Sequence, residues 1–154
     1  MHLIEEPFRL YTLRLKRYIY KMEKLEHIGI AVKSLSQSVP LFETLLNTQC
    51  YKEEMVESEA VRTAFFAVGD HKIELLESTD PEGIIAKFIA KKGEGVHHIA
   101  LAVSDIEAEM KRLKASGFVL LNEKPKRGAD NKLVCFLHPK NTNDVLIELC
   151  MENP

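Results

Sequence analysis

The sequence predicts an α+β fold built from two copies of a βαβββ module with a helix between them. HIGIAVKSL at 27–35 aligns with HIALAVSDI at 98–106, and HKIELLES at 71–78 aligns with DVLIELCM at 144–151. The first match has an offset of 71 residues, and the Ile-Glu-Leu shared by the second has an offset of 74, so the two matches recur in the same order at nearly the same spacing. A nearly constant offset indicates a repeated structural unit. Each half also shows alternating apolar residues, then helical spacing, then further alternation.

The first module is expected over residues 23–78. Residues 25–32 alternate as a strand, and residues 36–46 carry apolar side chains at helical spacing, with Pro40 inside the first turns. Because proline lacks the N–H that a helix needs, Pro40 is expected to weaken this helix. Further strands are expected at 49–57, 61–68 and 71–77, the last two joined by a Gly-Asp hairpin turn at 69–70.

A linking helix is expected within residues 79–94. Asp80 can cap it, Pro81 suits its first position, and Gly93 can end it.

The second module is expected over residues 95–154, so that residues 23–154 form one structural domain. It opens with a strand at 96–103 and a helix at 105–116, which a Ser104…Glu107 capping box would begin. The remaining strands are expected near 118–122, 132–137 and 145–150.

Residues 1–22 differ from the rest of the chain. The first 24 residues hold six Lys or Arg against three Glu, and apolar residues recur there at helical spacing. This pattern predicts a basic amphipathic helix that packs on the domain as an N-terminal extension.

The composition is typical of a globular protein, with 45% hydrophobic and 29% charged residues and a net charge of −2. This small charge provides no general attraction to nucleic acid, and no apolar run approaches the roughly 20 residues that span a bilayer. The three cysteines form no CxxC pair, which favours a reducing compartment over a disulfide framework. We therefore expect a cytoplasmic protein without nucleic-acid or membrane partners.

Two histidines and two glutamates occupy equivalent positions of the repeat: His27 with His98, and Glu74 with Glu148. In a strand, alternate side chains share a face, so each histidine shares its face with small residues, as a cavity wall requires. Carboxylates inside apolar strands are unfavourable unless they are paired or bind a metal. If the duplication is a spatial two-fold, all four side chains converge on a divalent ion such as Co, Ni, Mn, Fe or Zn.

Each of these residues also has a simpler reading. A single strand histidine is usually a hydrogen-bonded core residue, and a single glutamate in IEL is usually a charge at a sheet edge; the symmetric set favours ligation. His97 has the opposite strand parity to His98, so we expect it to pack with Ile99 and Leu101.

A cationic segment lies between residues 124 and 140. This segment contains several basic residues and a single acidic residue, Asp130. They can form a solvated loop, or a patch beside the cleft that binds the phosphates of a large anionic substrate. The residues concerned are Lys124, Lys126, Arg127, Lys132 and Lys140.

In HIGIAVKSL, VRTAFFAVGDHKIELLES, GVHHIALAVSDI and FLHPKNTNDVLIEL, the chain resembles the vicinal oxygen chelate superfamily and, within it, the methylmalonyl-CoA epimerases, from about residue 23 to residue 151. The resemblance implies a glyoxalase-like fold with a curved mixed sheet around a metal cleft, and a homodimer. It places the ion, Co²⁺ first among the candidates, on His27, Glu74, His98 and Glu148.

The resemblance also implies the reaction. The C2 proton of methylmalonyl-CoA leaves to give an enolate and returns on the other face, which interconverts the 2R and 2S epimers. Glu148 would be a ligand and one base, and Glu74 a ligand and its possible partner. Some epimerases carry a catalytic glutamate where this chain has Thr63; because threonine cannot act as a base, the second base stays unassigned.

Three other functions remain as alternatives. A glyoxalase I-like lactoylglutathione lyase would use the same four ligands. An extradiol dioxygenase usually needs only two histidines and one carboxylate, so a fourth ligand counts against it. A non-catalytic small-molecule-binding protein of the same superfamily typically lacks the metal ligands.

Overall fold

The computed structural model describes residues 22–154; except for Met22, the predicted N-terminal helix at 1–22 lies outside them. The first half comprises β1 (Lys24–Ala31), α2 (Leu35–Leu46), β2 (Lys52–Val56), β3 (Val61–Val68) and β4 (His71–Ser78). After α3 (Ile84–Lys92), the second half comprises β5 (Gly95–Ala102), α4 (Ile106–Ala115), β6 (Lys126–Arg127), β7 (Lys132–Leu137) and β8 (Ile147–Glu152). Within these residues, no helix combines the length and the apolar character that crossing a membrane requires.

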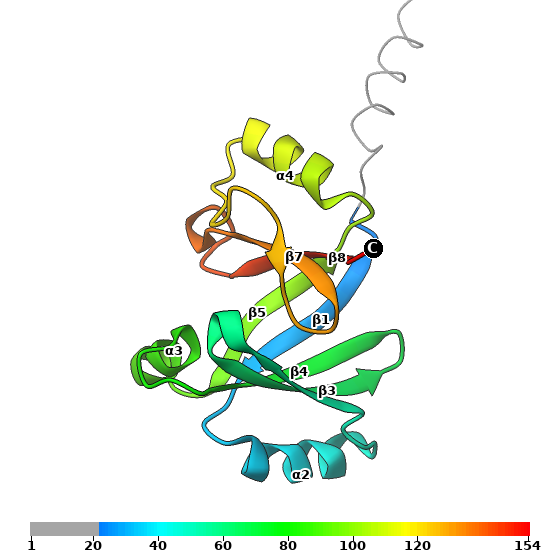
Figure 1. Cartoon of the computed structure of the whole chain (residues 1–154), viewed down its shortest axis with the longest axis vertical. Helices are drawn as coiled ribbons and strands as arrows, with labels where there is room; N and C mark the ends of the chain where they lie inside the picture. Colours follow the sequence, from blue (N-terminus) through cyan, green and yellow to red (C-terminus); the bar gives the residue numbers. More distant parts are fainter. Residues whose placement is uncertain (1–21) are drawn as a thin grey trace, which may run out of the picture.

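The eight strands form one mixed sheet in the order β2-β3-β4-β1-β5-β8-β7-β6. β1 pairs antiparallel with β5 at the centre, and each pairs in parallel with the last strand of its own half, β4 or β8. The order on one side of the centre therefore mirrors the order on the other. Figure 1 shows the sheet curling between α2 at one end of the molecule and α4 at the other. The predicted duplicated βαβββ fold is confirmed.

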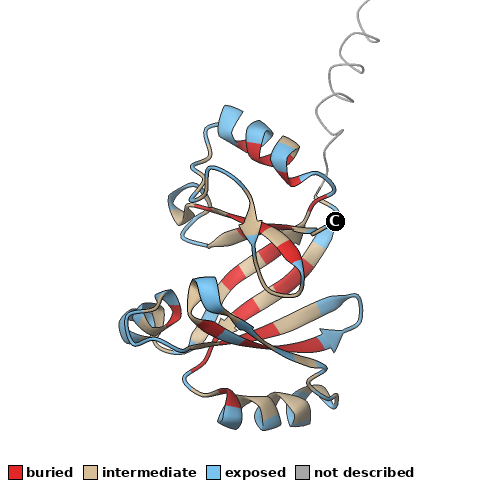
Figure 2. Cartoon of the chain, in the orientation of Figure 1, coloured by how far each residue is buried: buried red, intermediate tan, exposed pale blue. Residues whose placement is uncertain are grey.

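α2 and α4 each pack an apolar face on the outside of their own half of the sheet. In the first half, Val39, Phe42 and Leu46 of α2 pack against a cluster that includes Phe66 and Leu75. In the second half, the inner face of α4 packs against β7 and β8; its residues are Ile106, Met110 and Leu113. Burial of each of these three α4 side chains contributes about 1.5–3 kcal/mol. Figure 2 shows the buried residues on the strands and on the sheet-facing sides of the helices.

The predicted starts of α3 and α4 need correction. α3 begins at Ile84 with Gly83 as its cap, not at Pro81 with Asp80 as its cap, because Asp80 accepts a hydrogen bond from Glu82 N (2.9 Å) in a turn that precedes the helix. In α4 the cap is Asp105, whose carboxylate accepts from Ala108 N (2.9 Å), so the predicted Ser104…Glu107 capping box is wrong.

The strand predicted near 118–122 does not form. Leu120 makes only an isolated bridge with Leu137. The neighbouring backbone N–H, that of Phe136, donates to the side chain of Asn122 (3.1 Å) instead of to a backbone carbonyl. A side-chain acceptor thus replaces the hydrogen bond that would have extended the ladder.

Two β-bulges interrupt the pairing of β1 with β5. Leu25 and His27 pair with the consecutive residues Leu101 and Ala100, so Glu26 is an extra residue on β1. Gly29 pairs with His98 and Ile30 with Val96, so His97 is an extra residue on β5. Glu26 and His97 are themselves 71 residues apart, so the bulges are equivalent in the two halves. A bulge redirects side chains, and both of these residues line the central cavity.

An ion-pair network around the buried carboxylate of Glu26 joins the two halves beside this cavity. The Glu26 side chain is 4% exposed and accepts from Lys72 Nζ (2.6 Å), which also donates to Asp130 (2.8 Å). Asp130, from the loop before β7, also pairs with Lys52 of β2 (3.1 Å). The loop of the second half is thereby tied to two strands of the first.

Lys72→Met is expected to lower the free energy of unfolding by about 2 kcal/mol. Loss of one partner of a fully buried pair costs about 3–5 kcal/mol, and the expected value is smaller because Lys24 and Lys132 also lie near Glu26. Urea denaturation measures the change. Lys24→Met is the matched control, because Lys24 pairs with the same carboxylate at 3.5 Å but is 44% exposed, and it should cost less than about 1 kcal/mol. Equal effects of the two substitutions would contradict the expectation that the Lys72–Glu26 pair stabilises the fold more than the exposed Lys24–Glu26 pair does.

Candidate metal centre

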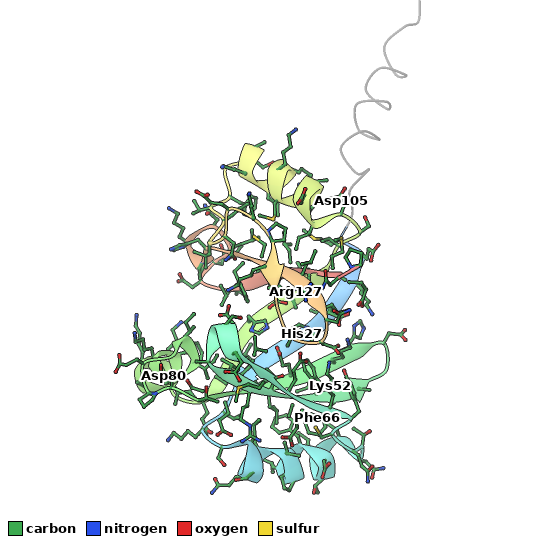
Figure 3. All side chains as sticks on the ribbon, viewed as in Figure 1. His27, Lys52, Phe66, Asp80, Asp105 and Arg127 are labelled. Carbon is green, nitrogen blue, oxygen red and sulfur yellow. The ribbon has the colours of Figure 1, made fainter. Side chains whose placement is uncertain are left out.

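The concave side of the sheet encloses a cavity of about 310 Å³ lined by both halves of the chain. His27, labelled in Figure 3, lies near the middle of the molecule between the two halves. The four predicted metal ligands all line this cavity and are all buried. They are His27, Glu74, His98 and Glu148.

The donor atoms of His27, Glu74 and His98 all lie within 4.8 Å of one another, and the Glu148 carboxylate lies beside the two imidazoles. The Nε2 atoms of His27 and His98 lie 3.1 Å apart. Glu74 Oε2 lies 3.2 Å from His27 Nε2 and 3.4 Å from His98 Nε2. The Glu148 carboxylate is slightly more distant, at 3.9 Å from His27 Nε2 and 3.5 Å from His98 Nε2.

The register of the sheet explains this convergence. Glu74 pairs with Gly29 of β1 on one side and with Phe65 of β3 on the other. Glu148 pairs with Ala100 of β5 and with Phe136 of β7. Each carboxylate therefore has a small residue on the central strand beside it and an aromatic residue on the outer one. The duplicated pairing brings both carboxylates to the two central histidines.

The arrangement fits a divalent metal ion. Ligand atoms bound to one ion at about 2.1 Å lie about 3.0 Å apart when octahedral and about 3.4 Å apart when tetrahedral. The donor separations around His98 Nε2, 3.1–3.5 Å, match this range. Two imidazoles and two carboxylates suit first-row transition metals, and such an ion would neutralise the two buried carboxylates.

The two carboxylates have different electrostatic surroundings. Burial alone would raise the pKa of Glu74, but hydrogen bonds from His27 and His98 lower it to about 2. Burial raises the pKa of Glu148, and the imidazoles offset this only in part. Burial would lower the pKa of His27, but the Glu74 and Glu148 carboxylates outweigh burial and raise it. Glu74 is thus the more firmly ionised of the two carboxylates.

Residues 26–136 match the Glyoxalase/Bleomycin resistance protein/Dioxygenase superfamily. The chain belongs to this superfamily. The curled eight-stranded sheet of two equivalent halves agrees with the fold of solved methylmalonyl-CoA epimerases.

Relatives and solved structures cover most of the chain. The ethylmalonyl-CoA/methylmalonyl-CoA epimerase of Cereibacter sphaeroides is 37% identical over 82% of this chain and 96% of its own length. A hypothetical protein from Bacillus halodurans is 42% identical with a TM-score of 0.82, covering 85% of this chain and 95% of its own. A variant of the Streptomyces coelicolor methylmalonyl-CoA epimerase, in complex with 2-nitronate-propionyl-CoA, is 31% identical with a TM-score of 0.82. The match covers 87% of this chain and 100% of the epimerase chain.

His97 does not lie where its strand parity predicted. It lines the cavity beside His98, and its Nδ1 lies 2.9 Å from Nδ1 of His98. Burial, with the nearby His98, lowers the pKa of His97 to about 4, so its ring is neutral at physiological pH. The bulge on β5 interrupts the alternation on which the prediction depended.

The position of Gly29 shows why a small residue is needed beside His98. A Cβ atom built on Gly29 would lie 2.2 Å from Cε1 of His98. The imidazole of His98 therefore rests directly on the backbone of β1. The same ring meets Phe136 edge to face, with ring centroids 5.8 Å apart.

The predicted cationic residues fall into three groups. Lys126 and Arg127 line the cavity; Lys126 pairs with Glu59 of the first half and lies 5.7 Å above the Phe136 ring. Lys132 also lines it but is buried and pairs with Glu152 and Glu26. Lys124 and Lys140 are exposed and lie outside the cavity lining.

Three further residues line the cavity: Glu26, Glu59 and Thr63. Glu26 and Glu59 were not predicted, and only the 71-residue equivalence of Glu26 with His97 could have indicated the first. Thr63 is buried in the lining, and its hydroxyl donates to the backbone carbonyl of Glu54 (3.4 Å).

Proposed function

We propose that the protein is a metal-dependent epimerase that interconverts (2R)- and (2S)-methylmalonyl-CoA. The observation that carries the proposal is the convergence of His27, Glu74, His98 and Glu148 in one cavity. Relatives named methylmalonyl-CoA epimerase, similar over most of the chain, support the choice of substrate.

The four residues would hold the ion, with Co²⁺ as our first choice and Ni²⁺, Mn²⁺, Zn²⁺ or Fe²⁺ as alternatives. When bound, the ion supplies a Lewis acid that stabilises the negative charge developing on the thioester oxygen as the C2 proton leaves. Glu148, whose pKa burial raises, takes or returns that proton on one face of C2. Because Thr63 cannot act as a base, Glu74 is the proposed partner on the other face.

The walls of the cavity have two further tasks. Apolar residues such as Phe65, Val134 and Phe136 exclude water from the reacting carbon. Lys126 and Arg127 are the best-placed cations for the coenzyme A phosphates, with Lys124 and Lys140 farther out; Lys132 already has two carboxylate partners. We also propose that the protein is a homodimer, as the resemblance to the epimerases implies, and that it is cytoplasmic.

Deuterium exchange tests the reaction. The Co²⁺-loaded protein, incubated with (2S)-methylmalonyl-CoA in D₂O, should place deuterium at C2 and produce the 2R epimer. His27→Ala, which removes one ligand, is the control and should lose this activity. Absence of exchange, together with turnover of the hemithioacetal of methylglyoxal and glutathione, would overturn the epimerase proposal in favour of a lactoylglutathione lyase.

A further inference from the structure

We infer that His97 is a positioning residue that fixes the tautomer and the ring orientation of His98. The inference depends on the proposed function only through the metal centre and is independent of the substrate.

The hydrogen-bond inventory of His98 leads to this assignment. Its Nε2 faces the other three ligands, at 3.1 Å from His27 Nε2, 3.4 Å from Glu74 and 3.5 Å from Glu148. To bind an ion there, Nε2 must offer a lone pair, so the ring hydrogen of neutral His98 must be on Nδ1. That N–H has an acceptor 2.9 Å away, Nδ1 of His97. The His97 ring then carries its own hydrogen on Nε2.

The surroundings hold both rings in this arrangement. The bulge on β5 brings His97 to the same side of the strand as His98. Phe88 of the linking helix α3 packs edge to face on His97, with centroids 5.0 Å apart and an interplanar angle of 83°. Gly29 lies against the His98 ring. A chain of contacts thus runs from α3 through His97 to the metal ligand.

The equivalent position in the first half has a different task. Glu26 is the residue that corresponds to His97, but its carboxylate is engaged by Lys72 and lies near Lys24 and Lys132. Among the described residues, no hydrogen bond joins Glu26 to the ring of His27. The two halves therefore support their histidines unequally, and the imidazole acceptor is specific to His98. Histidine ligands almost always donate their second N–H, and loss of such a partner typically weakens metal binding 10–100-fold.

Two substitutions separate the acceptor from the packing. His97→Phe keeps an aromatic ring against Phe88 but removes the acceptor, and it should weaken Co²⁺ binding about 10–100-fold. His97→Asn places an acceptor oxygen near the position of Nδ1, and it should recover most of that loss. Titration of the metal-free full-length proteins with Co²⁺, by calorimetry and by competition with a chelator, measures the affinities, and thermal melting without metal reports on folding.

The possible results distinguish this inference from the proposed function. Wild-type affinity in His97→Phe would overturn the inference, as would equal weakening in His97→Phe and His97→Asn, because packing would then explain the loss. The predicted order of affinities, wild type above Asn above Phe, supports it even if the protein fails to exchange the C2 proton of methylmalonyl-CoA. That last failure would overturn the epimerase proposal alone.

Discussion

Gly29→Ala is expected to abolish tight metal binding, with an affinity loss of at least about 100-fold, beyond the usual effect of losing an outer-shell partner. The added Cβ would lie 2.2 Å from Cε1, 2.5 Å from Nδ1 and 2.7 Å from Nε2 of His98, well inside van der Waals contact. His97 and Phe136 contact the same ring. The imidazole can therefore escape only by moving its Nε2 away from the other ligands. Calorimetric titration with Co²⁺ measures the loss.

A double substitution tests whether the clash involves the ring itself. Gly29→Ala alone should also lower the free energy of unfolding by about 1–3 kcal/mol, as overpacking does. In Gly29→Ala/His98→Ala the ring is absent, so the second substitution should restore part of this stability while metal binding stays lost. Wild-type Co²⁺ affinity in Gly29→Ala would show that the ring can move aside, and would contradict the prediction.

The duplication made most of the fold, and the grouping of the candidate metal ligands, predictable. His27 and His98, and likewise Glu74 and Glu148, occupy matching positions of the repeat, and two-fold related strands must bring matching positions together. This argument needs only the alignment of the chain with itself and the alternation of side chains along a strand. It does not need the details of any loop.

His97 and Glu26 could not be placed in this way. Each is the extra residue of a bulge, which arises from the pairing of β1 with β5 across 71 residues of chain. Neither bulged residue, nor either of its neighbours along its own strand, is a glycine or a proline. Strand parity is a local rule, so it fails where long-range pairing adds a residue to one strand.

The cationic segment, residues 124–140, shows a second limit of prediction from the sequence. In the sequence, Lys132 belongs to the candidate phosphate patch, because its segment contains only one acid, Asp130. In the fold it lies buried beside Glu26 and pairs with Glu152, both far from it in sequence. Charge counting along the chain detects a basic segment, but only the fold shows which charges already have a partner.

Glu148→Gln is expected to reduce epimerisation by about 10²–10⁴-fold, the usual contribution of one general acid or base. The substitution keeps the size of the side chain but removes its ability to take a proton. Glu148 is farther from the two imidazoles than Glu74 is, and burial raises its pKa, so it is the carboxylate better suited to proton transfer. The measurement is made at saturating Co²⁺, because the substitution also removes a charged ligand.

A comparison of deuterium exchange from the two epimers tests the role of Glu148 more sharply. If Glu148 serves one face of C2, the variant should lose deuterium exchange when it starts from the epimer whose proton faces Glu148, and should retain exchange from the other epimer. Glu74→Gln is the matched comparison, because it makes the same chemical change on the equivalent strand, and the proposed pairing predicts the opposite preference. Equal loss from both epimers in metal-loaded Glu148→Gln would show that Glu148 acts only as a ligand, since a one-sided base affects one epimer first.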